Sequence, residues 1–412
     1  QGPGPVHLNL AFREPLVGPP QPPVPGRPGG MPWHVRPPAV GLPDALVVQA
    51  LAGPGGRGVI VAGAGAGNPV AVHELAGALG WPVLADPRSG CRVPEPATVA
   101  AADALLRVDG FAAARRPEVV LRLGAPWASR VLAEWLAALD VPQYLVDPHH
   151  AWLDPGRSAS TVVASDPTLL ARAVLAASPQ PAPAGWLEGW TSAEKAAQAA
   201  IDAALAERSG AALNEPGLAR TVVDHLPAAA TLVVASSMPV RDVEWYGRPR
   251  PGLRVLSNRG ANGIDGVVSS ALGAALAGPG PTYALVGDLA FLHDINGLLV
   301  PGGAAGPVDA TVVVVDNGGG GIFSFLPQAT ALPPDRFERL LGTPHGLDLV
   351  AVARAHGVAA EPAASAEEVA AAVAALPAGL RVVVARTDRA ANVAVHEELH
   401  AAVAAAVAPT FE

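Results

Sequence analysis

Short apolar runs alternate with helix-like segments along most of the chain, and this alternation constrains the fold more than any other feature. Runs such as GVIVA (Gly58 to Ala62), EVVLRLG and ATVVVVDN have no polar face, so both of their sides must be covered. Segments of helical period separate these runs, which is the pattern of strand–helix–strand units in a parallel sheet. We therefore predict an α/β fold built from two doubly wound parallel-sheet domains.

Two proline-rich stretches divide the chain. The first, REPLVGPPQPPVPGRPGG, follows VHLNL, which alternates as a strand does, and we interpret residues 1–34 as the end of a preceding domain and an extended linker. The second, SPQPAPAG, separates a middle α/β domain at 35–180 from a second one at 181–412, which begins with a long helix. Because the chain opens at Gln1 on such a linker, we expect an amino-terminal domain to be missing.

Composition argues against several classes of function. The formal net charge is −9 and lysine and arginine form no cluster, which disfavours nucleic-acid binding. The single cysteine, Cys91, excludes an intramolecular disulfide and suits a reducing compartment. No apolar run reaches the ~20 residues needed to cross a bilayer, and no signal segment opens the chain. We expect a cytoplasmic globular protein with small-molecule partners.

Polar residues follow two neighbouring predicted strands. Asp288 comes after TYALVG, and Asn317 lies in the turn DNGGGG after the next strand. Ligands bind beyond the carboxyl ends of such strands, and Mg²⁺ is often held by one or two carboxylates together with phosphate oxygens. The helical pattern after Asp288, with Leu289, Leu292, Ile295 and Leu299 on one face, would also direct free N–H groups at an anion. Alone, each motif is as well explained by a helix N-cap or a flexible turn; together they predict a metal–diphosphate site.

Two loops that follow strands carry arginine. In SNRGANGIDG, Arg259 lies among glycines that allow backbone angles forbidden to other residues, namely Gly260, Gly263 and Gly266. In SSMPVR, Ser237 and Arg241 follow the strand TLVVA in the same way. The planar guanidinium group binds both oxygens of a carboxylate, so we predict that Arg241 and Arg259 are carboxylate clamps.

These motifs resemble those of thiamine-diphosphate enzymes, whose signature is GD followed by a turn that contains asparagine. More narrowly, SSMPVRDVEWYG, SNRGANGIDGVVSSALGAALA, GDLAFLHDINGLL, DNGGGGIFSFLPQ and GTPHGLDL are similar to the menaquinone-pathway family of 2-succinyl-5-enolpyruvyl-6-hydroxy-3-cyclohexene-1-carboxylate synthases, usually called MenD. The similarity extends from GPVHLNLAFREPL to the terminal helix, so it covers essentially the whole chain.

The resemblance implies a transferase of menaquinone biosynthesis that uses thiamine diphosphate and Mg²⁺ or Mn²⁺. Such an enzyme decarboxylates 2-oxoglutarate and joins the succinyl carbanion to isochorismate in a 1,4-addition. The implied metal ligands are Asp288, Asn317 and the carbonyl of Gly319. The implied substrate contacts are Ser237, Arg241, Arg259 and Arg130, the last at a position where lysine is expected. The implied cofactor contacts, besides the metal ligands, are Ile264, Gly287, Leu289, Ile322, Phe323 and Leu326, of which the last three are almost equally explained as ordinary core.

The resemblance also implies where catalysis would be completed. In this family the catalytic glutamate lies in an amino-terminal pyrimidine-binding domain, and the active site forms between subunits of a homodimer or tetramer. No catalytic residue can then be assigned in this chain, which would supply only the diphosphate half-site and be inactive alone. The resemblance places His345, in GTPHG, near the active site.

Two alternatives remain open at this stage. Another thiamine-diphosphate enzyme, such as an acetolactate synthase or a 2-oxoacid decarboxylase, would act on a monocarboxylate and would not need two arginine clamps. A truncated, scaffold-like protein would bind no cofactor. A dinucleotide-binding site at VAGAGAGNPV is disfavoured, because the motif GxGxxG needs glycine or alanine where Asn68 stands.

Overall fold

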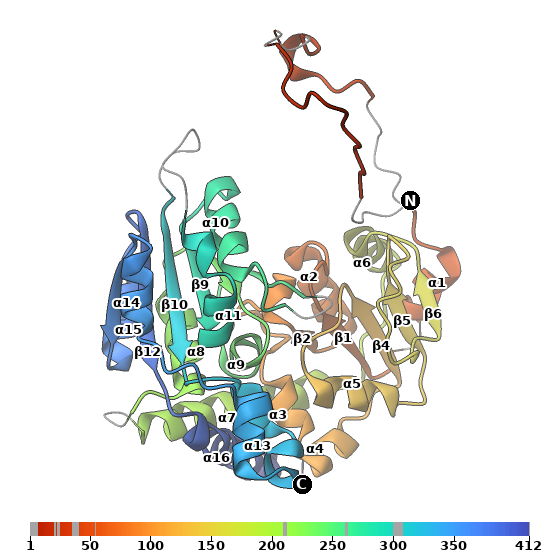
Figure 1. The fold of residues 1–412 in the computed structure, drawn as a ribbon. Helices are drawn as coiled ribbons and strands as arrows, with labels where there is room; N and C mark the ends of the chain where they lie inside the picture. Colours follow the sequence, from red (N-terminus) through yellow and green to blue (C-terminus); the bar gives the residue numbers. More distant parts are fainter. Residues whose placement is uncertain are drawn as a thin grey trace.

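The computed structural model describes residues 7–19, 22, 25–34, 41–53, 55–208, 212–259, 263–299 and 308–411. Within these residues the chain forms two six-stranded sheets whose paired strands are all parallel, each flanked by helices (Figure 1). The predicted α/β fold with two doubly wound sheets is confirmed. No helix in the described ranges combines the length and the apolar character that a membrane crossing requires.

The first sheet has the strand order β3-β2-β1-β4-β5-β6. Its strands are β1 (Gly58–Ala62), β2 (Val83–Ala85), β3 (Thr98–Val99), β4 (Val119–Leu123), β5 (Gln143–Val146) and β6 (Thr161–Val163). Its accompanying helices are α1 (Ala45–Ala52), α2 (Pro69–Leu79), α3 (Ala102–Leu106), α4 (Asp109–Ala114), α5 (Arg130–Ala137) and α6 (Pro167–Ala176). Asn68, which disfavoured the dinucleotide motif, caps α2 by accepting from the N–H groups of Val70 and Ala71.

The second sheet has the order β11-β12-β10-β9-β7-β8. Its strands are β7 (Thr231–Val234), β8 (Arg254–Leu256), β9 (Thr282–Gly287), β10 (Ala310–Asp316), β11 (Ala359–Ala363) and β12 (Leu380–Arg386). Helices of this half of the chain are α8 (Glu215–His225), α9 (Met238–Tyr246), α10 (Val267–Ala277), α11 (Asp288–His293), α12 (Gln328–Ala331), α13 (Pro334–Phe337), α14 (Leu349–Ala355) and α15 (Ala366–Ala374). Gly287 pairs with Val315, so Asp288 and Asn317 leave neighbouring strands at the same edge, as predicted.

Two long helices connect the two halves. The predicted helix at 186–206 is α7 (Trp186–Ala206), and it packs against the last helix, α16 (Arg389–Val407), along the foot of Figure 1. Both helices contribute to the hydrophobic core of the first sheet, and the indole N–H of Trp186 donates to the carbonyl of Gly58 in β1. The carboxyl end of the chain is therefore packed on the first domain.

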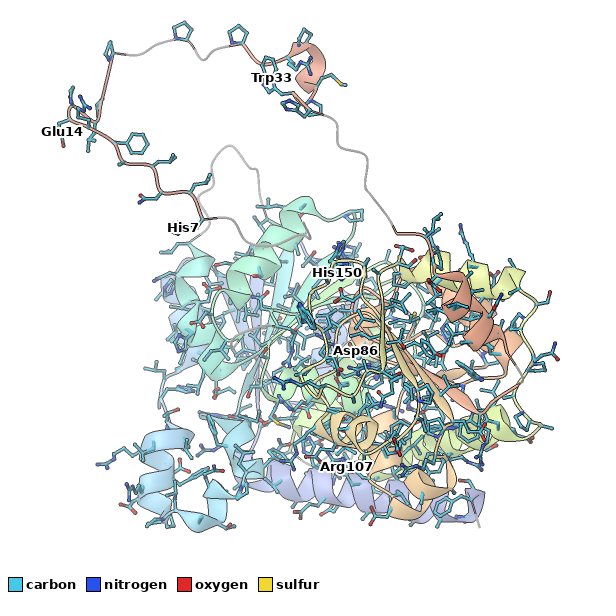
Figure 2. All side chains as sticks on the ribbon, turned by 90° about the vertical axis from the view of Figure 1, so that its right-hand side faces the viewer. His7, Glu14, Trp33, Asp86, Arg107 and His150 are labelled. Carbon is cyan, nitrogen blue, oxygen red and sulfur yellow. The ribbon has the colours of Figure 1, made fainter. Side chains whose placement is uncertain are left out.

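Local predictions were wrong at two places. Residues 7–10, expected to alternate as a strand, form none; Leu8 and Leu10 are 74% and 69% exposed, on a segment that extends away from the sheets (Figure 2). The helix expected after Asp288 stops at His293, because the backbone leaves helical geometry at Asp294, with φ of −120°. Its buried residues are Asp288, Ala290 and Phe291, while Leu299, expected on the same helix face as Leu289, is 59% exposed.

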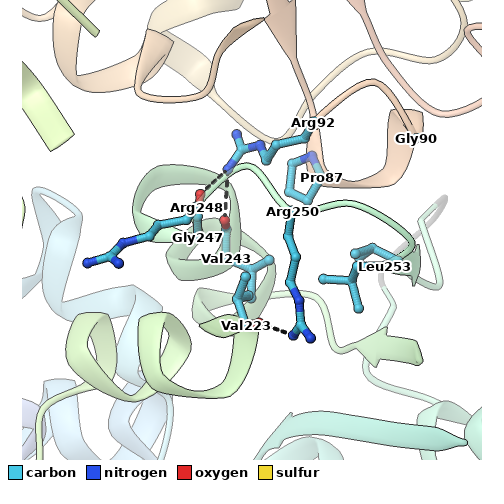
Figure 3. A pocket seen from close by; sticks show the side chains of 10 residues that line it. Pro87, Gly90, Arg92, Val223, Val243, Gly247, Arg248, Arg250 and Leu253 are labelled. Carbon is cyan, nitrogen blue, oxygen red and sulfur yellow. Dashed lines mark hydrogen bonds between the residues drawn. The ribbon is translucent and has the colours of Figure 1, made fainter. Parts of the chain in front are cut away.

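Arg92 of the first domain closes the carboxyl end of α9 in the second. Its guanidinium, buried between the two domains, donates to the carbonyl oxygens of Val243 and Gly247 at 3.1 and 2.9 Å (Figure 3). It also donates to the carbonyl oxygen of Glu244 at 2.7 Å. It also donates to carbonyl groups of its own domain at Ala85 and Ala100. A positive charge at the carboxyl end of a helix is favourable, and every bond is made to a buried acceptor, so Arg92 fixes α9 against the first domain.

We expect Arg92→Met to lower the free energy of unfolding by about 3 kcal/mol, because buried carbonyl groups lose a charged donor. Arg116→Met is the control: its guanidinium makes one bond, to the carbonyl of Ala138, from an exposed position. The control should change stability by less than about 0.5 kcal/mol. Urea denaturation followed by tryptophan fluorescence measures both variants, and equal losses would contradict the role assigned to Arg92.

Candidate functional site

The carboxyl edge of the second sheet borders a cleft of ≈ 610 Å³. This size lies within the usual range for small-molecule sites. Its wall includes the loops after β7, β9 and β10 and the start of α9. Ligands in open α/β sheets bind at this place, beyond the carboxyl ends of the strands. The cleft thus combines segments that are far apart in the sequence.

The structure brings together most of the residues singled out in the sequence. Eleven of them line the cleft: Ser237, Arg241, Arg259, Ile264, Gly287, Asp288, Leu289, Asn317, Gly319, Ile322 and Phe323. Ile322 also packs against the first hydrophobic core, so it is both a core residue and part of the cleft wall. Of the glycines around Arg259, Gly263 and Gly266 have φ of 65° and 66°, and Gly260 lies outside the described residues.

Two predicted residues do not line the cleft. Arg130 begins α5 with a largely exposed side chain that pairs with Glu134 at 3.3 Å. Leu326 follows the short helix Gly321–Phe325 and is half-buried outside the cleft wall. A substrate contact from Arg130 and a cofactor contact from Leu326 thus find no support in this geometry, because a motif match fixes a position in the chain but not the direction of the side chain.

Asp288 is a buried carboxylate, 2% exposed, at the wall of the cleft. Its Oδ1 accepts from the N–H of Leu289 at 2.6 Å, and its Oδ2 accepts from the N–H of Gly319 at 2.8 Å. Burial raises the pKa of the Asp288 carboxyl, and these two N–H groups oppose that rise. Among the described residues no lysine or arginine pairs with it, so its charge is compensated only by dipoles and by His345.

Asn317 and Asp288 share one backbone donor. The N–H of Gly319 also donates to Asn317 Oδ1, at 3.2 Å, so both side-chain oxygens lie within hydrogen-bonding reach of a single nitrogen atom. Gly319 has φ of 147°, and a β-carbon there would collide with the carbonyl oxygen of Gly342, so the loop can pass this point only with glycine. A carboxylate oxygen and an amide oxygen that converge in this way form a donor set suited to Mg²⁺.

His345 lies between two carboxylates at the same place. Its Nε2 is 3.3 Å from Asp288 Oδ2 and 3.5 Å from Asp316 Oδ1. Donor atoms of these three residues lie within 4.8 Å of one another, close enough to share an ion. The position expected for His345 beside the site is therefore correct, whereas Asp316 was not singled out in the sequence.

Glu215 also lines the cleft and was not singled out in the sequence. It is the first residue of α8, is 3% exposed, and its Oε1 accepts from Asn317 Nδ2 at 2.7 Å. Burial, together with the nearby carboxyl of Asp242, raises the pKa of the Glu215 carboxyl to about 7. In the sequence, LNEPG resembles any helix start with an asparagine cap, so no local signal distinguished this glutamate.

Two arginines, Arg241 and Arg259, add positive charge to the lining of the cleft. Arg241 on α9 donates to the carbonyl of Ser237 at 2.6 Å. Burial lowers the pKa of the Arg259 guanidinium, and the positive charges of Arg88 and Arg241 lower it further. Positive groups held this close together favour an anionic ligand, so the lining of the cleft combines acidic, oxygen-rich groups with basic ones.

Ser237 precedes α9 in a strained conformation, with φ of 72° and ψ of −134°. A residue other than glycine in such a region costs about 1–3 kcal/mol, and strain of this kind concentrates at functional sites. Ser237→Gly should therefore raise the free energy of unfolding by about 1 kcal/mol, after allowance for the backbone entropy of glycine.

Ser237→Ala separates strain from the loss of the hydroxyl group, because alanine keeps the β-carbon. It should leave stability within about 0.5 kcal/mol of the parent chain. Urea midpoints of the three proteins provide the comparison. A glycine variant no more stable than the alanine variant would show that position 237 is unstrained.

Comparisons with known proteins agree with this site. Residues 54–234 match the family described as "Middle domain of thiamine pyrophosphate", and residues 242–387 match "Thiamine pyrophosphate enzyme, C-terminal TPP binding domain". Residues 235–241, between the two matches, include the first turn of α9, and Met238, Pro239 and Arg241 of that turn line the cleft.

Individual relatives narrow the family. Proteins named 2-succinyl-5-enolpyruvyl-6-hydroxy-3-cyclohexene-1-carboxylate synthase from Saccharopolyspora erythraea, Thermobifida fusca and Myxococcus xanthus are 41%, 44% and 40% identical to this chain. Each alignment covers 98% of this chain and 70–71% of the relative. The chain therefore belongs to the 2-succinyl-5-enolpyruvyl-6-hydroxy-3-cyclohexene-1-carboxylate synthase family of thiamine pyrophosphate enzymes.

Proposed function

We propose that this chain carries the metal–diphosphate and substrate-carboxylate half of a menaquinone-pathway transferase. The complete reaction decarboxylates 2-oxoglutarate and adds the succinyl unit to isochorismate. The observation that carries the proposal is the convergence of Asp288 and Asn317 on one backbone N–H group in a cleft that Arg241 and Arg259 also line. Family membership provides independent support.

The residues at the sheet edge fit a divalent ion and the diphosphate of thiamine diphosphate. Asp288, Asn317 Oδ1 and the carbonyl of Gly319 would hold Mg²⁺ or Mn²⁺, since hard cations of this kind take oxygen ligands. Gly287 and Leu289 flank the carboxylate, and Ile264 and Phe323 supply apolar wall for the rings. When bound, the cofactor supplies the nucleophilic carbon and the electron sink that decarboxylation requires.

The two arginines favour this reaction over that of an acetolactate synthase. Both substrates, 2-oxoglutarate and isochorismate, carry two carboxylates, and a guanidinium group binds each carboxylate through two parallel bonds. Arg241 is held by the carbonyl of Ser237, which orients its fork toward the cleft. A monocarboxylate such as pyruvate would leave one of these two arginines without a carboxylate partner.

Proton transfer at the bound cofactor would need a carboxyl group, and no described residue that lines this cleft has one free for that role. Of the described residues that line it, three carry a carboxyl: Glu215, Asp265 and Asp288. Glu215 is bonded to Asn317, Asp288 belongs to the metal set, and Asp265 is exposed beside His293. We propose that the catalytic glutamate comes from a pyrimidine-binding domain, and that the complete site forms between subunits of a homodimer or tetramer.

Isothermal titration with thiamine diphosphate and Mg²⁺ tests the metal–diphosphate site. We expect binding by the parent chain and at least 100-fold weaker binding by Asp288→Ala, a loss of about 2.8 kcal/mol. Asp335→Ala, which removes an exposed carboxyl of α13 outside the cleft, is the control and should bind as the parent does. Absence of heat with the folded parent chain would refute the proposed site.

Turnover tests the proposed division of the active site. With thiamine diphosphate, Mg²⁺, 2-oxoglutarate and isochorismate, the chain alone should release no CO₂ and form no product above background. Adding a pyrimidine-binding domain from one of the relatives is expected to restore CO₂ release from 2-oxoglutarate but not from pyruvate. Product formed by the chain alone would show that it already contains the catalytic group.

A further inference from the structure

We propose that Glu215 is a positioning residue: it holds the side-chain amide of Asn317 in the one orientation that presents Oδ1, and not the NH₂ group, to the divalent ion. This inference rests on the proposed function, since it assigns a role toward the ion that Asn317 would bind. Glu215 itself would touch neither the ion nor the substrate.

The amide of Asn317 is constrained from both ends. Its Nδ2 donates to Glu215 Oε1 at 2.7 Å, and its Oδ1 accepts from the N–H of Gly319 at 3.2 Å. A carboxyl oxygen accepts and a backbone N–H can only donate, so the two partners require the same orientation. The oxygen is thereby turned toward Gly319 and Asp288, where the other donors converge.

This orientation matters because the two ends of an amide have nearly the same shape and opposite polarity. Rotation by 180° would place an N–H₂ group where the ion needs an oxygen atom, and would convert a ligand into a repulsive dipole. The N–H of Gly319 also donates to Asp288, so it holds the Asn317 amide less firmly than an unshared donor would. The shorter bond to Glu215 is the stronger of the two.

Besides the bond from Asn317, Glu215 accepts one further hydrogen bond in the described structure, from the hydroxyl group of Thr387 at 3.4 Å. It opens α8, but the cap is supplied by Asn214, whose side chain accepts from the N–H of Gly217. Among the described residues no lysine or arginine pairs with its carboxyl group. Burying a carboxyl without an ionic partner is costly, and its strongest bond is the one to Asn317. Partners that orient metal ligands typically change metal affinity by about 10- to 100-fold.

Exchanging the two side chains tests the inference with little change in shape. In Glu215→Gln the glutamine can offer either end to Asn317, and in Asn317→Asp two carboxyl groups face each other. The double variant E215Q/N317D restores one donor and one acceptor in reversed order and leaves a carboxylate oxygen for the ion. Mn²⁺ affinity, measured by electron paramagnetic resonance in the presence of thiamine diphosphate, is the readout, and it needs no turnover.

We expect each single variant to bind Mn²⁺ about tenfold more weakly than the parent, and the double variant to bind within about threefold of it. A double variant whose loss equals the combined losses of the single ones would overturn the inference. So would a Glu215→Met variant that keeps its fold, by circular dichroism, and binds Mn²⁺ as the parent does.

The parent chain and Asp288→Ala separate this outcome from failure of the proposed function. If the parent does not bind Mn²⁺ with thiamine diphosphate, the metal–diphosphate site itself is wrong. If the parent binds and Asp288→Ala does not, while the Glu215 variants bind normally, the site stands and only the role of Glu215 is refuted.

Discussion

A carboxylate buried at the shared edge of β9 and β10 is the constraint on which the site depends. The parallel register places Gly287 beside Val315, so the chain must turn away from both strands at Asp288 and Asn317. Burial raises the pKa of Asp288, and within the described structure its only ionic partner is a histidine. The close approach of the Gly319 loop, which only glycine allows, supplies an N–H group and aligns the amide oxygen beside the carboxylate. Several oxygen atoms therefore lie close together, and a bound cation would reduce the repulsion between them.

Helix α9 connects this edge of the second sheet to the first domain, which supplies none of the proposed metal ligands. Its first turn holds Arg241 at the cleft, and its last carbonyl groups are bound by Arg92 from the first domain (Figure 3). Glu244, near the end of α9, in turn accepts from the N–H of Ala128, just before α5. Arg92 of the first domain thus binds α9, and Glu244 of α9 in turn binds the first domain. These contacts fix the position of α9 and therefore of Arg241 at the cleft. The middle domain, none of whose described residues line the cleft, can therefore still determine the geometry of the cleft.

The sequence predicted those features that are set by neighbours in the chain or by strand direction. Continuous apolar runs gave β1, β9, β10 and β12 because a strand buried on both faces has no polar alternative. The edge strand β11 escaped prediction, since AAEPA carries a charge and a proline that only an edge tolerates. The meeting of Asp288 and Asn317 followed from parallel pairing. Glu215 could not be found, because its contact spans 102 residues and no periodic pattern records it.

Two donor sets share Asp288, and their chemistry differs. Asn317 and the backbone at Gly319 offer oxygen only, whereas Asp316 and His345 add a nitrogen donor within reach of the same carboxylate. Hard ions such as Mg²⁺ prefer the first set, and softer transition metals accept imidazole readily. His345 is already within hydrogen-bonding distance of Asp288, so it competes with an ion for that carboxylate and not for the amide. If Glu215 holds the Asn317 amide with its oxygen toward Asp288, an ion would be bound by the all-oxygen set in preference to the set that contains His345. The orientation of one side chain would then contribute to the choice of metal.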